Sequence, residues 1–125
     1  INVIGNGGNE APAGYVAGVS ADAMLEVLTR TLGGDSLDHG VRVVGISPGD
    51  LLNERGIMFL RRQAEEELGD PERWSEQLAE LPGGRAGASE EVADAIVFLA
   101  SPRSNYTSGA ILTIDGGVSA RRAVM

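Results

Sequence analysis

The feature that most constrains the fold is the stretch 41–50, Val-Arg-Val-Val-Gly-Ile-Ser-Pro-Gly-Asp. Its first half is apolar, rich in β-branched residues and nearly free of polar alternation. That pattern is typical of a strand buried on both faces of a parallel sheet. Pro48-Gly49 then ends the run abruptly. We therefore expect a loop at the carboxyl edge of this strand, which is the edge where open α/β sheets bind ligands.

Apolar spacing predicts the other elements in the order strand, helix, strand, helices, helix, strand. Strands are expected at 1–4, 41–46 and 110–114, and helices at 13–38, 54–68, from Pro71 onward and at 89–100. Ser89 is the expected N-cap of the last helix, because serine side chains accept hydrogen bonds from free helix N–H groups. The order predicts an α/β fold that is half of a doubly wound parallel sheet.

Composition excludes several classes of protein. The chain of 125 residues is long enough for one core, and without cysteine neither disulfides nor a cysteine metal site is expected. Its net charge of -8 argues against nucleic acid as a partner. It shows no membrane-spanning run and no signal-peptide pattern, so we expect no membrane partner and a cytoplasmic location. Because it opens on a strand-like run without an initiator methionine, we expect a fragment of a longer chain.

The predicted helix 13–38 has apolar residues on more than one side. One stripe is formed by Val16, Val19, Ala23 and Val27, and a second by Leu25, Leu28 and Leu32. A single sheet face cannot cover both stripes, so we expect a homo-oligomer. Gly33-Gly34 near the helix end either allow close packing or weaken that end. His39, the single histidine, is expected to be solvated at the helix stop.

Two short helical stretches follow the Pro-Gly loop. Their many charges are most simply a solvated face. A second interpretation is that residues 53–85 form a mobile lid over a substrate, with Trp74 facing it.

Several segments, in order and at matching spacing, resemble the C-terminal half of the short-chain dehydrogenase/reductase family. They are Leu-Thr-Arg-Thr-Leu at 28–32, Gly-Val-Arg-Val at 40–43, Ser-Pro-Gly at 47–49, the helix 91–101 and the final strand with its Asp-Gly-Gly end at 108–117. The resemblance implies a Rossmann-like fold over residues 1–125, NAD or NADP as cofactor, and hydride transfer between a small-molecule carbonyl and an alcohol.

The same resemblance implies a cofactor site in the loop after the central strand. Pro48, Gly49 and Leu51 would line the nicotinamide pocket. Asn53 stands where the family usually has threonine, and its amide can hydrogen-bond a carboxamide or a phosphate.

The catalytic residues depart from the family pattern, which uses a serine and a Tyr-x-x-x-Lys pair. The register of Leu28-Thr29-Arg30 puts Gly18 at the tyrosine position and Asp22 at the lysine position. There is no serine near Gly5, and all ten basic residues of the chain are arginine. A carboxylate at residue 22 disfavours a nearby phenolate, which is the reverse of the lysine's effect.

Tyr15 remains as the candidate proton donor, since residues 15, 18 and 22 share one helical stripe. Two interpretations stay open. Helical side chains lean toward the N-terminus, so Tyr15 would lean away from Gly18 and pack structurally at the helix start. Alternatively, it is a displaced catalytic tyrosine. For the whole protein, the alternatives are an NAD(P)-dependent oxidoreductase and a catalytically silent member that serves as a binding or assembly module.

Overall fold

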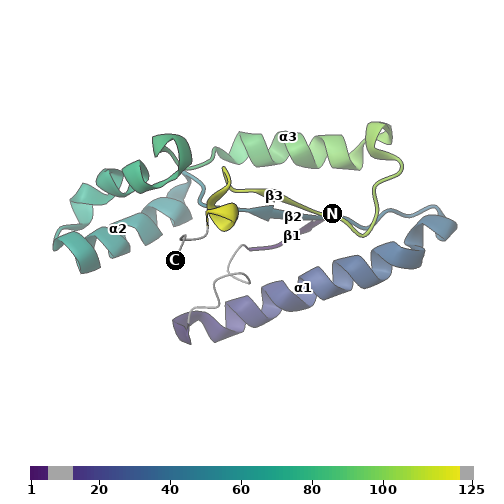
Figure 1. Cartoon of the computed structure of the whole chain (residues 1–125), viewed down its shortest axis with the longest axis horizontal. Coiled ribbons are helices and arrows are strands. Elements are labelled where there is room, and N and C mark those ends of the chain that lie inside the picture. The colour runs from purple at the N-terminus through teal and green to yellow at the C-terminus, as the bar shows by residue number, and fades with distance from the viewer. Residues whose placement is uncertain (6–12, 122–125) are drawn as a thin grey trace. The chain divides into compact units, whose positions relative to one another are not determined.

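The computed structural model describes residues 1–5 and 13–121, so of the predicted loop 5–9 only Gly5 is described. Its strands and α-helices are β1 (Asn2–Val3), α1 (Val16–Asp35), β2 (Gly45–Pro48), α2 (Glu54–Leu68), α3 (Ser89–Ala100) and β3 (Ile111–Ile114) (Figure 1). Short 3-10 helices are η2 (Ala13–Tyr15), η3 (Ser36–His39), η4 (Pro71–Glu80), η5 (Pro82–Gly84), η6 (Pro102–Ser104) and η7 (Val118–Ala120). The chain forms two compact units, Ile1–Pro48 with Val92–Ile114, and Gly49–Glu91 with the chain from Asp115 on.

The first unit holds a three-stranded parallel sheet in the order β1-β2-β3, which confirms the predicted architecture. Asn2 pairs with Gly45, and Gly45 pairs with Ile111. The sheet core is apolar, with Ile4 and Ile46 completely buried. Figure 1 shows α1 and α3 on opposite sides of the three strands, as in a doubly wound sheet.

The central strand begins later than predicted, at Gly45 instead of Val41, and it extends to Pro48. The apolar run predicted burial correctly for its second half, since Val44 and Ile46 are buried, but Val41 at its start is exposed. The strand's limits, however, are set by its partners, because β3 begins only at Ile111. Burial and pairing are separate properties, and a single sequence reports the first far better than the second.

The predicted helix 13–38 is broken into η2, α1 and η3. Near the C-terminal end of α1, a Cβ on Gly33 would lie 2.1 Å from the backbone nitrogen of Gly109. No heavy atom lies within 4 Å of a Cβ built on Gly34. Close packing, one of the two predicted roles of the Gly33-Gly34 pair, is therefore confirmed for Gly33.

Arg42 ties the approach to β2 to the end of α3. Its guanidinium donates hydrogen bonds to four backbone carbonyls, those of Leu99, Ala100, Ser101 and Ser104. Leu99 and Ala100 lie in the last turn of α3, where helix carbonyls have no partner within the helix, whereas Ser101 follows α3 and Ser104 ends η6. A positive charge also suits the negative end of the helix dipole.

The second unit contains α2 and η4, each capped by a side chain. The Asn53 Oδ1 accepts a hydrogen bond of 2.9 Å from the Gly56 N–H at the start of α2. The Asp70 carboxylate does the same for the Glu72 N–H, also at 2.9 Å, and Pro71 occupies the first position of η4. Both segments start where the sequence predicts, because these residue types satisfy free N–H groups.

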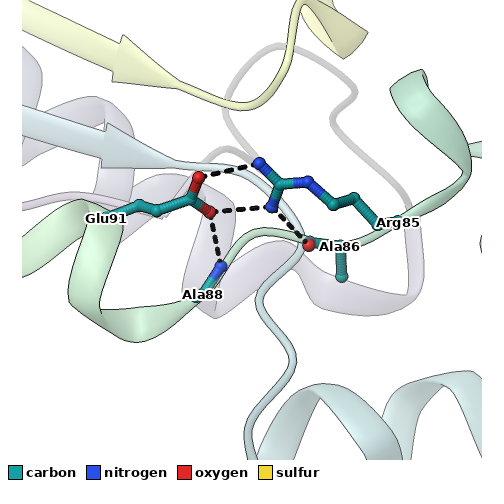
Figure 2. A network of polar contacts seen from close by, with 4 residues as sticks. All are labelled: Arg85, Ala86, Ala88 and Glu91. Atoms are coloured by element: carbon teal, nitrogen blue, oxygen red, sulfur yellow. Dashed lines mark hydrogen bonds and ion pairs between the residues drawn. The ribbon is translucent and has the colours of Figure 1, made fainter.

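An ion pair closes the loop that leads into α3 (Figure 2). Arg85 donates to both carboxylate oxygens of Glu91, at 2.7 and 2.8 Å, and to the Ala86 carbonyl at 3.1 Å. Glu91 also accepts the Ala88 N–H at 2.8 Å. The prediction that Ser89 is the N-cap is wrong, because the helix already includes Ser89 and the Glu91 carboxylate reaches back instead. We call this arrangement the Arg85–Glu91 clasp.

Candidate functional site

The N-terminal end of α1 lies at the carboxyl edge of the sheet. The Asn2 side-chain amide donates to Thr29 Oγ1 at 2.9 Å, and the Gly5 N–H donates to Asp22 Oδ1 at 2.9 Å. The start of β1 thus lies beside residue 29 of α1, and the chain just after β1 lies beside residue 22. The helix therefore runs antiparallel to the strand. At about 1.5 Å per residue, Gly18 lies about 6 Å beyond Asp22 in the direction of the strand's carboxyl end.

Pro48 reaches the same edge from β2. It is the last residue of that strand, paired with Ile114, and β2 runs parallel to β1. The structure thus brings the helix start with Tyr15 and the end of β2 to one edge of one sheet. This is the edge at which open α/β sheets bind ligands.

The Tyr15 ring lies across Gly18, contrary to the expectation that it leans away. A Cβ built on Gly18 would lie 2.0 Å from Tyr15 Cζ, 2.1 Å from Cε1 and 2.5 Å from the phenol oxygen. Tyr15 precedes α1 as its N-cap, with φ -127° and ψ 37°. Because that backbone is not helical, the direction rule for side chains within a helix does not apply to it.

Asp22 binds the backbone at the end of β1. Besides the hydrogen bond from Gly5, its carboxylate packs so closely that a Cβ on Gly5 would lie 2.6 Å from Oδ2. The residue at the family's lysine position therefore acts here as an acceptor for the strand end. Sequence reasoning placed Asp22 on the correct stripe but did not identify its partner.

The other predicted cofactor residues, Gly49, Leu51 and Asn53, belong to the second unit. Leu51 is bridged to Gly87, whose N–H donates to the Asp50 carbonyl at 2.8 Å. Gly87 also accepts the Leu52 N–H at 2.8 Å. We call residues 49–53 the Pro-Gly loop; backbone pairing fixes its path.

Gly49 and Asn53 each have a defined role in this loop. A Cβ on Gly49 would lie 2.6 Å from the Asp115 Cβ, so only glycine fits without a shift. Asn53 is exposed, and its side-chain oxygen caps α2.

A cavity of about 250 Å³ lies between α2 and η4, next to the Pro-Gly loop. Its lining is Asp50, Leu51, Gly56, Phe59, Leu60, Gln63, Gln77, Glu80 and Leu81. Gln77 is buried and donates to the Glu67 carboxylate at 3.1 Å. Trp74 is not among the lining residues. The sequence offered a signal for this cavity, since Phe59 and Gln63 are four residues apart on one helix face.

Among the described residues, the Arg85–Glu91 clasp holds the carboxyl group whose pKa is lowered most. Hydrogen bonds from the Arg85 guanidinium, and then from the Ala88 N–H, lower the pKa of Glu91 to about 2. The carboxylate thus stays charged over the whole physiological range. Within residues 1–5 and 13–121, no three His, Cys, Asp or Glu side chains gather as a metal site would. In that same part of the chain, no helix has both the length and the apolar character needed to cross a membrane.

Comparisons with known proteins agree with this geometry. Residues 1–119 match the family described as Enoyl-(Acyl carrier protein) reductase. Galactitol 2-dehydrogenase (L-tagatose-forming) of Cereibacter sphaeroides is 39% identical over 99 residues, which are 79% of this chain and 36% of that protein. The 3-oxoacyl-[acyl-carrier-protein] reductase FabG of Vibrio cholerae is 32% identical over 117 residues, covering 94% of this chain and 43% of FabG.

Among solved structures, the NADPH-bound short-chain oxidoreductase of Pseudomonas aeruginosa PAO1 containing an atypical catalytic center superposes with a TM-score of 0.74. It is 34% identical, and the match covers 97% of this chain and 45% of that one.

The parallel sheet with helices on both sides is half of a Rossmann-type fold. The chain belongs to the short-chain dehydrogenase/reductase family. It spans less than half of the length of the relatives named above.

Proposed function

We propose that the complete protein is an NAD(P)-dependent oxidoreductase that transfers a hydride between a small-molecule carbonyl and an alcohol. Family membership supports the reaction class, and the NADPH-bound relative supports the cofactor. When bound, the nicotinamide ring gives or takes the hydride. The remaining steps concern what this chain's own side chains do.

The Pro-Gly loop fits the nicotinamide end of such a cofactor. The exposed Asn53 amide nitrogen can donate to a carboxamide or phosphate oxygen, while its own oxygen holds the start of α2. Pro48, Gly49 and Leu51 are uncharged, and the family resemblance assigns them to the lining of the nicotinamide pocket.

Tyr15 is the proposed proton donor, and the observation that carries this assignment is the position of its ring over Gly18. The phenol thereby occupies the space of the residue that the family resemblance aligns with its catalytic tyrosine. During reduction, the phenol donates its proton to the carbonyl oxygen as that oxygen gains negative charge.

Residues 53–85 are the proposed substrate lid. They supply most of the lining of the cavity between α2 and η4, which combines polar and apolar side chains as small-molecule sites do. Motion of such segments commonly controls substrate entry and product release.

The complete protein is also proposed to be a homo-oligomer. Large apolar side chains remain exposed along α1, namely Val16, Met24, Val27, Leu28 and Leu32. Sedimentation of the complete protein at micromolar concentration should show a species larger than one chain. A clean monomer there contradicts this part of the proposal.

Tyr15→Phe tests the proton donor in the complete protein. Carbonyl reduction should fall by about 10² to 10⁴, the usual contribution of general acid catalysis, with cofactor affinity nearly unchanged. Tyr106→Phe is the matched control, because Tyr106 is 94% exposed and lies outside the proposed site. If Tyr15→Phe turns over at the wild-type rate, Tyr15 is structural and another group must donate the proton.

A further inference from the structure

We propose that Gly18 is a positioning residue: its missing side chain is the space in which the Tyr15 phenol lies. This inference rests on the proposed function. Overlap with a Cβ at residue 18 involves Cζ and the oxygen of Tyr15, at 2.0 and 2.5 Å. Carbon atoms in contact stay about 3.5–4.0 Å apart, so even one methyl group would displace the phenol end of the ring.

Two other glycines at α1 show that this requirement is not shared by every glycine of the segment. A Cβ built on Gly34, in the same helix, or on Gly14, just before it, would meet no heavy atom within 4 Å. Glycine destabilises a helix interior relative to alanine. At position 18 the need for space beside the Tyr15 ring is a physical reason for a glycine. At Gly34 the structure offers no such reason, which makes that residue the natural control.

The backbone of Tyr15 supplies the second half of the arrangement. Because the residue is the N-cap and has a non-helical conformation, its ring can cross the first turn and reach residue 18. The phenol of Tyr15, about one turn before Gly18, therefore lies in the space that a side chain at residue 18 would fill.

The gap acts by restricting the phenol. Tyr15 is 47% exposed, so solvent on that side does not by itself select one rotamer of the ring. Contact with the flat surface at Gly18 holds the oxygen at one place on the carboxyl edge of the sheet. A donor misplaced by about 1 Å can lose about 100-fold in rate.

The test compares Gly18→Ala with Gly34→Ala in the complete protein. For Gly18→Ala, kcat for carbonyl reduction should fall about 10- to 100-fold, with KM and cofactor affinity changed less than about twofold. Gly34→Ala should leave kcat unchanged. With ¹³C-labelled tyrosine, the ring signal that disappears in Tyr15→Phe should shift in Gly18→Ala and remain in place in Gly34→Ala.

A second experiment moves the phenol from residue 15 to residue 18. Tyr15→Ala removes it, and the double variant Tyr15→Ala/Gly18→Tyr returns a phenol directly on residue 18. The double variant should be at least about tenfold more active than Tyr15→Ala. Wild-type kcat in Gly18→Ala, or no recovery in the double variant, overturns the role of Gly18. An active Tyr15→Phe overturns the proton donor itself, so the two failures are distinguishable.

Discussion

The helix start and the Pro-Gly loop are held in place in different ways. The loop is fixed by backbone hydrogen bonds to Gly87, within a segment closed by the Arg85–Glu91 clasp. The helix start depends on side chains: one carboxylate on the Gly5 N–H and one ring in the gap at Gly18. In the proposed enzyme, the first region would bind cofactor and the second would place the proton.

This difference predicts which property each region controls. A backbone-paired loop tolerates changes of exposed side chains but not a shift of the chain itself. A region built from side chains can lose its chemistry while the fold stays intact. Variants in the loop should therefore alter cofactor affinity together with stability, whereas variants at the helix start should alter rate first.

The largest effect is expected from Gly56→Ala, which moves the loop. Its Cβ would lie 1.9 Å from the Leu51 carbonyl oxygen, so the backbone must shift. We expect a loss of about 3 kcal/mol in the free energy of unfolding. Cofactor affinity should fall roughly tenfold or more, since 1.4 kcal/mol of lost binding is tenfold.

Urea unfolding and cofactor titration measure the two quantities for Gly56→Ala, with Gly34→Ala as the control in open space. Wild-type values for both quantities would show that the loop adapts, and the contrast between the regions would then be lost.

A smaller effect is expected from Asp22→Ala at the helix start. It removes one side-chain hydrogen bond to the backbone, worth about 1 kcal/mol of unfolding free energy. Asp22→Asn keeps an oxygen that can accept the Gly5 N–H, so it should lose less. Equal losses in the two variants, measured by urea unfolding, would show that charge and not the hydrogen bond matters here.

The smallest effect is a loss of folding stability at low pH, through the Glu91 carboxylate of the clasp. The Glu91 pKa is lowered from 4.5 to about 2 in the folded chain, so the clasp stabilises the fold fully above pH 4.5. That contribution is lost as the pH falls from about 4.5 toward 2. Glu91→Gln lacks this titration, so the stability difference between wild type and variant should shrink across that window in thermal melts. A difference that stays constant from pH 6 to pH 2.5 contradicts the role of the clasp.

Much of the fold could be predicted from the sequence because burial leaves a clear pattern. The apolar run before Pro48 and the periodic helices predicted the element order and the parallel sheet, which the structure confirms. The start of the strand at Gly45 could not be predicted, because its partners decide where pairing begins. The links made by Arg42 were also missed, since they join residues far apart in the sequence.

The candidate site was predicted less completely, for a local reason. Gly18 and Asp22 lie in α1 as predicted, but Tyr15 precedes the helix and the predicted direction of its ring was wrong. That direction depends on the backbone angles of a helix cap, which sequence spacing does not specify. The role of Asn53 as a cap was within reach, because asparagine before a helix is a known cap signal. The assignments of Pro48, Gly49, Leu51 and Asn53 to a cofactor, and of Tyr15 to catalysis, stay predictions.

The parallel sheet has a consequence for how this chain reaches its native state. Asn2 pairs with Gly45, and Gly45 pairs with Ile111, so every strand pairing joins distant parts of the chain. Such topologies must close long loops before any strand pairing stabilises them, and they fold more slowly than helical bundles of similar size. α1 relies on local contacts, so its turns can form in microseconds or less. During the delay, strands that have not yet paired are open to association with other copies, so folding temperature and chain concentration should affect the yield of folded protein.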